Sequence, residues 1–184
     1  MKATGIVRRI DDLGRVVIPK EIRRTMRIRE GDPLEIYTDR EGEVIFKKYS
    51  PIGELSSFAG EYAETLHKVC GISVLIFDRD AVIASAGVPK REYQDRKMSE
   101  ELEEIVERRQ FYSRKTPSER ITATQDGGSH YVSCAMPIIT EGDMIGCVCS
   151  VTNDESAASA TLSPESEAKL IQTAATFLSK QMEN

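Results

Sequence analysis

The sequence predicts two domains, a small β-rich domain followed by a larger α+β domain, and three observations support this division. The chain has 184 residues, which is long for one average domain. Residues 1–50 carry 12 basic and 9 acidic side chains, a net charge of +3, whereas residues 51–184 carry 13 basic and 21 acidic ones, a net charge of −8. After residue 50 the pattern also changes from short strands to a long amphipathic helix. We therefore expect domains at residues 1–50 and 55–184, joined by a linker at residues 51–54.

The N-terminal domain should contain four short strands and one helix of two turns. Its first strand has apolar side chains on both faces, and Gly14 supplies turn chemistry before the second strand. Pro19 suits the first position of a helix, and Ile22 and Met26 would face inward, leaving Arg23, Arg24 and Arg27 outside. The expected elements are strands at residues 3–10, 16–18, 34–38 and 43–48 and a helix at residues 19–26.

A domain of this size would bury only about 60% of its unfolded surface if it folded alone. Exchange of hairpins between two chains would cover both faces of the first strand. We therefore expect a hairpin-swapped homodimer, in which the two-fold axis doubles every surface feature of the domain.

The C-terminal domain should be an antiparallel sheet with flanking helices, because its predicted hairpins are separated by a single helix. The long first and last helices carry apolar stripes. These stripes either pack on the domain's own sheet or join those of other subunits, and we favour the second, which gives a homotetramer. The expected elements are helices at residues 53–70, 99–110 and 164–182 and strands at residues 72–77, 81–86, 120–125, 130–139 and 144–151.

The first 29 residues hold nine Lys or Arg and three acidic residues, a local charge of +6 on a chain whose net charge is −5. We call residues 1–29 the basic segment. A basic segment on an acidic protein favours an anionic partner, of which nucleic acid is the commonest. Arginine contacts phosphate through charge-assisted bonds or grips guanine with both arms of its guanidinium. We therefore expect double-stranded DNA as the partner and no membrane.

Other chemistry is poorly supported by the sequence. His67 and His130 lack a motif, and neither a phosphate-binding GxxxxGKS/T motif nor a catalytic triad pattern occurs. The cysteines lack CxxC spacing; a turn at Glu141-Gly142 would set Cys134 opposite Cys149, but core packing is the favoured interpretation. We expect no enzyme, no cofactor and no metal. No apolar run approaches the roughly 18 residues of a membrane span, and the start lacks a signal peptide, so we expect a cytoplasmic, nucleoid-associated protein.

Residues 1–49, with LGRVVIP followed by an Arg-Arg pair, resemble the swapped-hairpin DNA-binding domain of the AbrB family of bacterial transition-state regulators. The resemblance implies an intertwined dimeric barrel. It also implies that Arg8, Arg15, Arg23 and Arg24 contact DNA. Arg9 belongs to the same motif but is not included, because neighbours on a strand point in opposite directions.

The remainder resembles a GAF-type sensory domain in its flanking helices, its antiparallel sheet and its final hairpin, PIITEGDMIGCVCSV. This resemblance implies a domain for assembly through helices or for sensing of an unidentified small molecule. The full length is similar to the stage V sporulation protein T family, which implies a transcriptional regulator that activates and represses sporulation genes. The alternative is an antitoxin-like or scaffolding protein, because related swapped-hairpin domains occur in toxin–antitoxin pairs.

Overall fold

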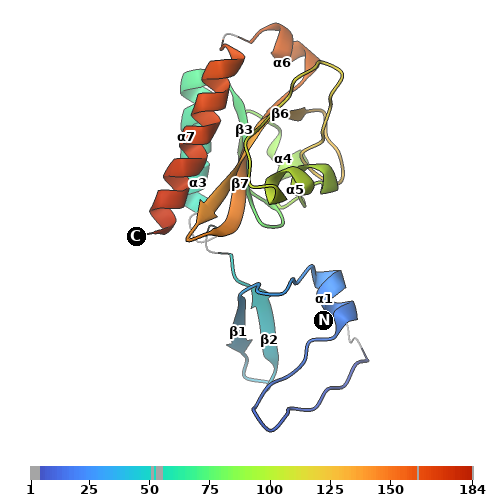
Figure 1. Cartoon of the computed structure of the whole chain (residues 1–184). Coiled ribbons are helices and arrows are strands. Elements are labelled where there is room, and N and C mark those ends of the chain that lie inside the picture. The colour runs from blue at the N-terminus through green and yellow to red at the C-terminus, as the bar shows by residue number, and fades with distance from the viewer. Residues whose placement is uncertain (1–4, 51, 53–55, 161, 184) are drawn as a thin grey trace. The chain divides into compact units, whose positions relative to one another are not determined.

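The computed structural model describes residues 5–50, 52, 56–160 and 162–183, shown in Figure 1. The chain forms two compact units, Met1–Tyr49 and Ser50–Asn184, and each is described by itself. The linker expected at residues 51–54 lies outside the described residues except for Ile52. That side chain is fully buried and packs in the core of the second unit.

The N-terminal unit contains one helix and one hairpin, as expected. Helix α1 spans Lys20–Met26, so it begins one residue later than predicted. Pro19 occupies the N-cap instead of the first helical position. Strands β1 (Leu34–Thr38) and β2 (Val44–Lys48) pair antiparallel, with Ile36 opposite Phe46. The backbone N–H of Gly42 bonds the carbonyl of Asp39 and closes the turn between them.

The strands expected at residues 3–10 and 16–18 are absent from residues 5–10 and 16–18, so that prediction is wrong for these described residues. Residues 5–18 run without strand pairing apart from the hydrogen-bonded turn that Asp11 begins. A strand persists only where its N–H and C=O groups find a second strand, and nothing in the described part of this chain offers one to them.

The N-terminal unit has no buried hydrophobic core of its own in the described residues. Val7 is 85% exposed and Val17 is 69% exposed, and Met26, which we expected to face inward, is 52% exposed. Every described hydrophobic residue that is buried lies in the second unit. The other large exposed hydrophobic residues of the N-terminal unit are Ile6, Ile10, Leu13, Val16, Ile36, Tyr37, Val44, Phe46 and Tyr49.

The C-terminal unit is a five-stranded antiparallel sheet between two layers of helices, which confirms the α+β prediction (Figure 1). The strand order is β4-β3-β7-β6-β5. The long helices α3 and α7 cover one face, and α4 and α5 cover the other. The elements are α3 (Ser56–Cys70), β3 (Ser73–Asp78), β4 (Val82–Ala86), α4 (Lys90–Tyr93), α5 (Glu100–Glu107), β5 (Tyr112–Ser113), β6 (Tyr131–Thr140), β7 (Asp143–Thr152), α6 (Asp154–Ala158) and α7 (Pro164–Met182).

Alternation along β3 builds a core on each face of the sheet. Val74 and Ile76 point to α3 and α7, whereas Leu75 and Phe77 point to the side of α4 and α5. All four are fully buried. This explains why β3 is a continuous apolar run although the sheet is antiparallel.

The strand expected at residues 120–125 is a loop that touches other strands through isolated bridges only. Ser99 accounts for this, because its N–H bonds the carbonyl of Ala123 and its hydroxyl donates to that of Thr122. The same hydroxyl accepts from the N–H of Leu102 and caps α5. Residues 120–125 are therefore bound to the start of helix α5 instead of to a strand. The edge of the sheet is formed by the short strand β5, which was not predicted and pairs with β6.

We predict that Gly146→Ala destabilises the C-terminal unit by about 1–3 kcal/mol, because a Cβ at this position of β7 would collide with the carbonyl oxygen of Phe77 on β3. Urea unfolding followed by circular dichroism measures the change. Gly60→Ala in α3 is the matched control, since a Cβ there meets nothing and should stabilise the helix by about 0.5–1 kcal/mol. Equal stability of the two variants would contradict the prediction.

Candidate nucleic-acid interface

The four arginines expected at DNA come from three segments of the N-terminal unit. Arg8 lies exposed on the extended segment, and among the described residues its guanidinium donates to the neighbouring carbonyl of Val7 alone, at 3.3 Å. Arg15 closes the following turn, and Arg23 and Arg24 lie on α1. Within the described residues, neither Arg8 nor Arg15 is hydrogen-bonded or ion-paired to α1.

The carboxylate of Asp11 organises the turn and orients Arg15. Its Oδ1 accepts from the backbone N–H groups of Leu13 (3.0 Å) and Arg15 (2.7 Å), and its Oδ2 accepts from Nε of Arg15 at 2.8 Å. The hydrogen bonds from the backbone and the side chain of Arg15 lower the pKa of Asp11. The carboxylate is therefore ionised at neutral pH and leaves the two terminal nitrogens of Arg15 free of described partners, available to a phosphate or a base edge.

The arginines of α1 differ in exposure. Arg24 is exposed, as expected, but Arg23 is half-buried, and its Nε is buried without a hydrogen-bond partner in the described part of the chain. Arg27 is also half-buried and ends the helix in the left-handed conformation, with φ of 51°. The N–H of the next residue, Ile28, returns to the carbonyl of Arg23 at 2.8 Å. The end of the helix at Met26 agrees with the predicted range, but glycine is the usual residue in this conformation, so the left-handed conformation of Arg27 was not predicted.

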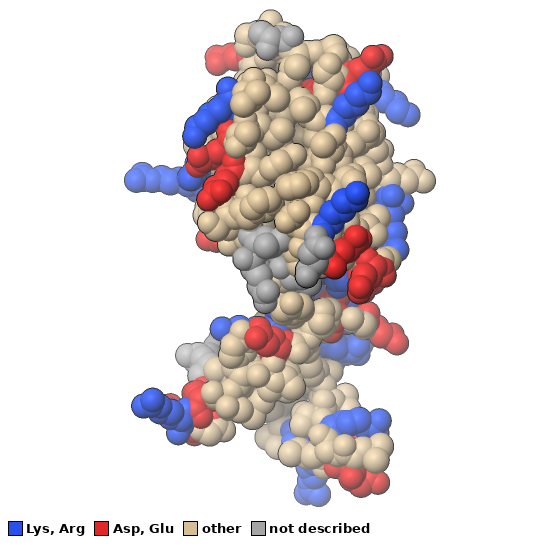
Figure 2. Space-filling model, turned by 90° about the vertical axis from the view of Figure 1, so that its left-hand side faces the viewer, with Lys and Arg blue, Asp and Glu red and all other residues tan. Residues whose placement is uncertain are grey.

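On one face of the N-terminal unit the described Lys and Arg side chains are dispersed. On the face drawn in Figure 2, Lys and Arg side chains project from separate places on the N-terminal unit, with uncharged surface between them. Arg8, Arg23 and Arg24 have no carboxylate partner among the described residues, whereas Arg15 is paired with Asp11. These unneutralised charges keep the N-terminal unit suited to an anionic partner.

The cysteines lie in the sheet as core residues. Cys147 and Cys149 share one face of β7, but Cys134 pairs with Ser150 instead of Cys149, because an irregularity between Ile138 and Ile139 shifts the register by one residue. Burial raises the pKa of Cys134 to about 11 and that of Cys147 to about 12. These thiols are therefore neutral.

One group of side chains in the described part of the chain lies close enough to share a metal ion. It consists of Asp39, Glu41 and Glu43 in the β1–β2 turn. Asp39 and Glu41 are exposed, and the carboxylate of Asp39 is already bonded to the backbone N–H groups of the other two residues. This cluster is explained by its role in the turn.

Family models divide the chain as the fold does. A model described as "Stage V sporulation protein T C-terminal, transcription factor" matches residues 54–183, and one described as "Antidote-toxin recognition MazE, bacterial antitoxin" matches residues 7–53. A solved GAF domain/HD domain protein from Geobacter sulfurreducens shares the fold, with a TM-score of 0.51 at 18% identity over 70% of this chain and 92% of that one. The family model over residues 54–183 and the shared fold together define the class, a transcription factor whose C-terminal unit has a GAF-like fold.

Two relatives from Bacillus subtilis (strain 168) narrow this class. Transition state regulatory protein AbrB is 52% identical over 71 residues, which are 39% of this chain and 72% of that protein. Stage V sporulation protein T is 51% identical over 185 residues, which cover 100% of this chain and 99% of that protein. The chain belongs to the stage V sporulation protein T family.

We predict that one thiol of the native full-length chain reacts rapidly with a disulfide reagent such as dithionitrobenzoate at mildly alkaline pH. Cys70, at the end of α3, is half-buried, whereas Cys134, Cys147 and Cys149 are buried. Burial raises the pKa of all three and keeps them as thiols. Absorbance counts the released thiolate; Cys70→Ser should remove the rapid phase, and denaturant should expose the remaining thiols. More than one rapid thiol in the folded chain would contradict the prediction.

Proposed function

We propose that the chain is a DNA-binding regulator of sporulation genes, which activates some promoters and represses others. In this proposal Arg8, Arg15, Arg23 and Arg24 contact double-stranded DNA. The observation that carries it is a basic segment of charge +6 on a chain of net charge −5, in which Arg8, Arg23 and Arg24 lack carboxylate partners in the described residues. Full-length similarity to a sporulation protein, and membership of a family described as transcription factors, support the regulatory role.

The N-terminal units pair as a hairpin-swapped dimer in this proposal. The apolar side chains of residues 5–18 and of the β1–β2 hairpin are exposed in one subunit. Patches of this kind on a small domain mark an interaction surface. A two-fold partner would cover them and bring two copies of the basic segment together, while the C-terminal domains, with a net charge of −8 each, stay away from the phosphates.

Two such dimers join through α3 and α7 into a homotetramer. These helices lie on the side of the C-terminal unit that Figure 2 turns to the viewer, and that view shows a broad uncharged surface with Lys, Arg, Asp and Glu at its margins. Phe177 of α7 stacks on Tyr62 of α3, with ring centroids 5.3 Å apart, yet remains 37% exposed. Val69 near the end of α3 is 77% exposed. These residues support a helical bundle between subunits.

The C-terminal domain senses a small molecule, and the proposal assigns it no catalytic reaction, cofactor or metal. We place the protein in the cytoplasm, associated with the nucleoid. No helix formed by the described residues is long and apolar enough to cross a membrane.

An antitoxin-like or scaffolding role is the second candidate, and the match of residues 7–53 to the MazE antitoxin model favours it. Purification of the chain from its native cells distinguishes the two functions. A stoichiometric small toxin would support the antitoxin role, whereas its absence together with promoter occupancy would support the regulator.

We predict that Arg15→Ala and Arg23→Ala together abolish specific DNA binding in fluorescence anisotropy. Each contact should contribute about 1–3 kcal/mol if it reads a base, and each lost phosphate contact should lower the salt slope by about one. Arg40→Ala, an exposed arginine in the β1–β2 turn, is the matched control and should bind as the wild type does. Circular dichroism should show that all variants remain folded. Wild-type affinity in the folded double variant would refute the assignment of the surface.

We predict that Phe177→Asp converts the tetramer to dimers, because a carboxylate at this exposed aromatic position would be desolvated in a helical bundle. Light scattering coupled to size exclusion measures the mass. Thr176→Asp is the control, since it adds the same charge to an exposed position about 100° around the same helix. A tetramer that survives Phe177→Asp would place the assembly surface elsewhere.

A further inference from the structure

A cavity of about 420 Å³ opens within the C-terminal unit, on the side of the sheet covered by α3 and α7. His67 and Cys70 from the last turn of α3 line it together with Glu167 from the first turns of α7. The sheet contributes Ser133 and Cys134 of β6. The volume lies near the lower end of the range of about 300–1,000 Å³ that is typical of small-molecule sites, which suits a small metabolite.

The cavity contains one cation and one anion that do not neutralise each other. Arg114 and Glu167 are both half-buried, and in the described part of the chain neither makes an ion pair. The carboxylate of Glu167 lies close enough to the thiol of Cys134 to help raise the pKa of that thiol, of which burial is the main cause. Neither charge is neutralised by an opposite charge among the described residues, so a ligand that supplies both opposite charges would gain two charge-assisted hydrogen bonds.

Arg114 is held in place from two directions. Its backbone N–H donates to the carbonyl of Ser133 at 2.9 Å, beside β5. Its guanidinium lies 4.5 Å from the centre of the Tyr131 ring, a cation–π contact that uses none of its N–H donors. The guanidinium of Arg114 is therefore held in position, and in the described part of the chain its N–H donors remain available to a ligand.

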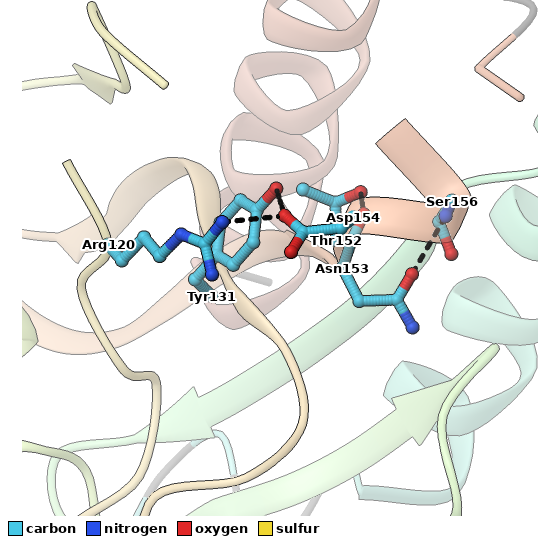
Figure 3. A network of polar contacts seen from close by, with 6 residues as sticks. All are labelled: Arg120, Tyr131, Thr152, Asn153, Asp154 and Ser156. Carbon is cyan, nitrogen blue, oxygen red and sulfur yellow. Dashed lines mark hydrogen bonds and ion pairs between the residues drawn. The ribbon is translucent and has the colours of Figure 1, made fainter. Parts of the chain in front are cut away.

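The polar network in Figure 3 fixes the wall beside Arg114. Asp154 Oδ1 accepts from Arg120 Nη2 at 2.8 Å and from the hydroxyl of Tyr131 at 3.3 Å. The side chain of Asn153 caps α6 by accepting from the N–H of Ser156, a residue that also lines the cavity. The start of α6 is thus joined to the aromatic ring that supports Arg114, so the site is organised before any ligand enters.

We propose that this cavity binds a small zwitterion, with its carboxylate on Arg114 and its ammonium group on Glu167, the chemistry of a free α-amino acid. A simple anion would be repelled by Glu167, and a simple cation by Arg114. Hydroxyl groups of Ser73, Ser113, Ser133 and Thr152 line the rest of the polar wall. This inference rests on the sensing role proposed above and specifies its ligand class and its position. The ligand would touch the end of α3 and the beginning of α7, the two helices assigned to assembly.

Isothermal titration of the full-length chain with common L-α-amino acids, each added singly, tests the ligand class. At least one should bind, and its carboxamide and N-acetyl derivatives, which remove one charge each, should bind about ten- to a hundredfold more weakly. The inference is overturned if no amino acid binds, or if either derivative binds as well as the parent.

Matched variants test the site. Arg114→Gln and Glu167→Gln should each weaken binding of that amino acid about ten- to a hundredfold. Lys115→Gln and Glu165→Gln remove exposed charges of the same sign nearby, outside the cavity lining, and should leave binding unchanged. Wild-type binding by Glu167→Gln would refute the inference. All four variants should bind DNA as the wild type does without ligand, so a failure here is separable from a failure of the regulatory proposal.

Discussion

The N-terminal unit depends on one constraint, the burial of apolar side chains that a single subunit leaves exposed. Ordering each backbone residue costs about 1–2 kcal/mol, and burying one large apolar side chain returns about 1.5–3 kcal/mol. Val7, Ile10 and Val17 return little while they are exposed. On the proposed dimer, folding and association of this unit are one equilibrium, so the arginines are positioned only at protein concentrations that keep two chains together.

The C-terminal unit buries its apolar side chains within one chain, so the outer sides of its helices are available for contacts with other molecules. Both faces of β3 are covered, so the sheet is stable without further contacts. Helices α3 and α7 each bury one side on the sheet and leave aromatic and aliphatic side chains such as Phe177 and Val69 outside. The last turn of α3 and the first turns of α7 also line the cavity, together with Arg114 and residues of the sheet.

The sequence was sufficient to predict an element wherever that element is determined by its own residues and by one adjacent segment of the chain. Alternation and turn residues located the β1–β2 hairpin, most of the sheet and the long helices, and α7 begins at Pro164, as predicted. The expected strand at residues 120–125 failed because Ser99 competes for its backbone, and the pairing of Cys134 was shifted by an irregularity in the strand register that leaves no composition signal. The strand at residues 3–10 is not formed over residues 5–10 for a different reason, because no strand in the described part of the chain pairs with them. The candidate arginines came from a family motif, and their individual exposures, above all that of Arg23, followed from packing that no motif encodes.

Regulation in such a molecule does not require the ligand to reach the DNA-binding surface. If α3 and α7 join two dimers, the tetramer presents two DNA-binding units whose second contact is intramolecular, and its strength is set by effective concentration. A ligand that changes the spacing of these helices would change avidity while leaving every arginine contact intact.

The turn that orients Arg15 would not respond to pH in the neutral range. Because the pKa of Asp11 is lowered in the folded chain, its contribution to the stability of the turn is fully present above the unfolded value of 3.8 and is lost only in acid. Control at neutral pH would then come from assembly, and the cavity lined by Arg114 and Glu167 is where a metabolite would exert it.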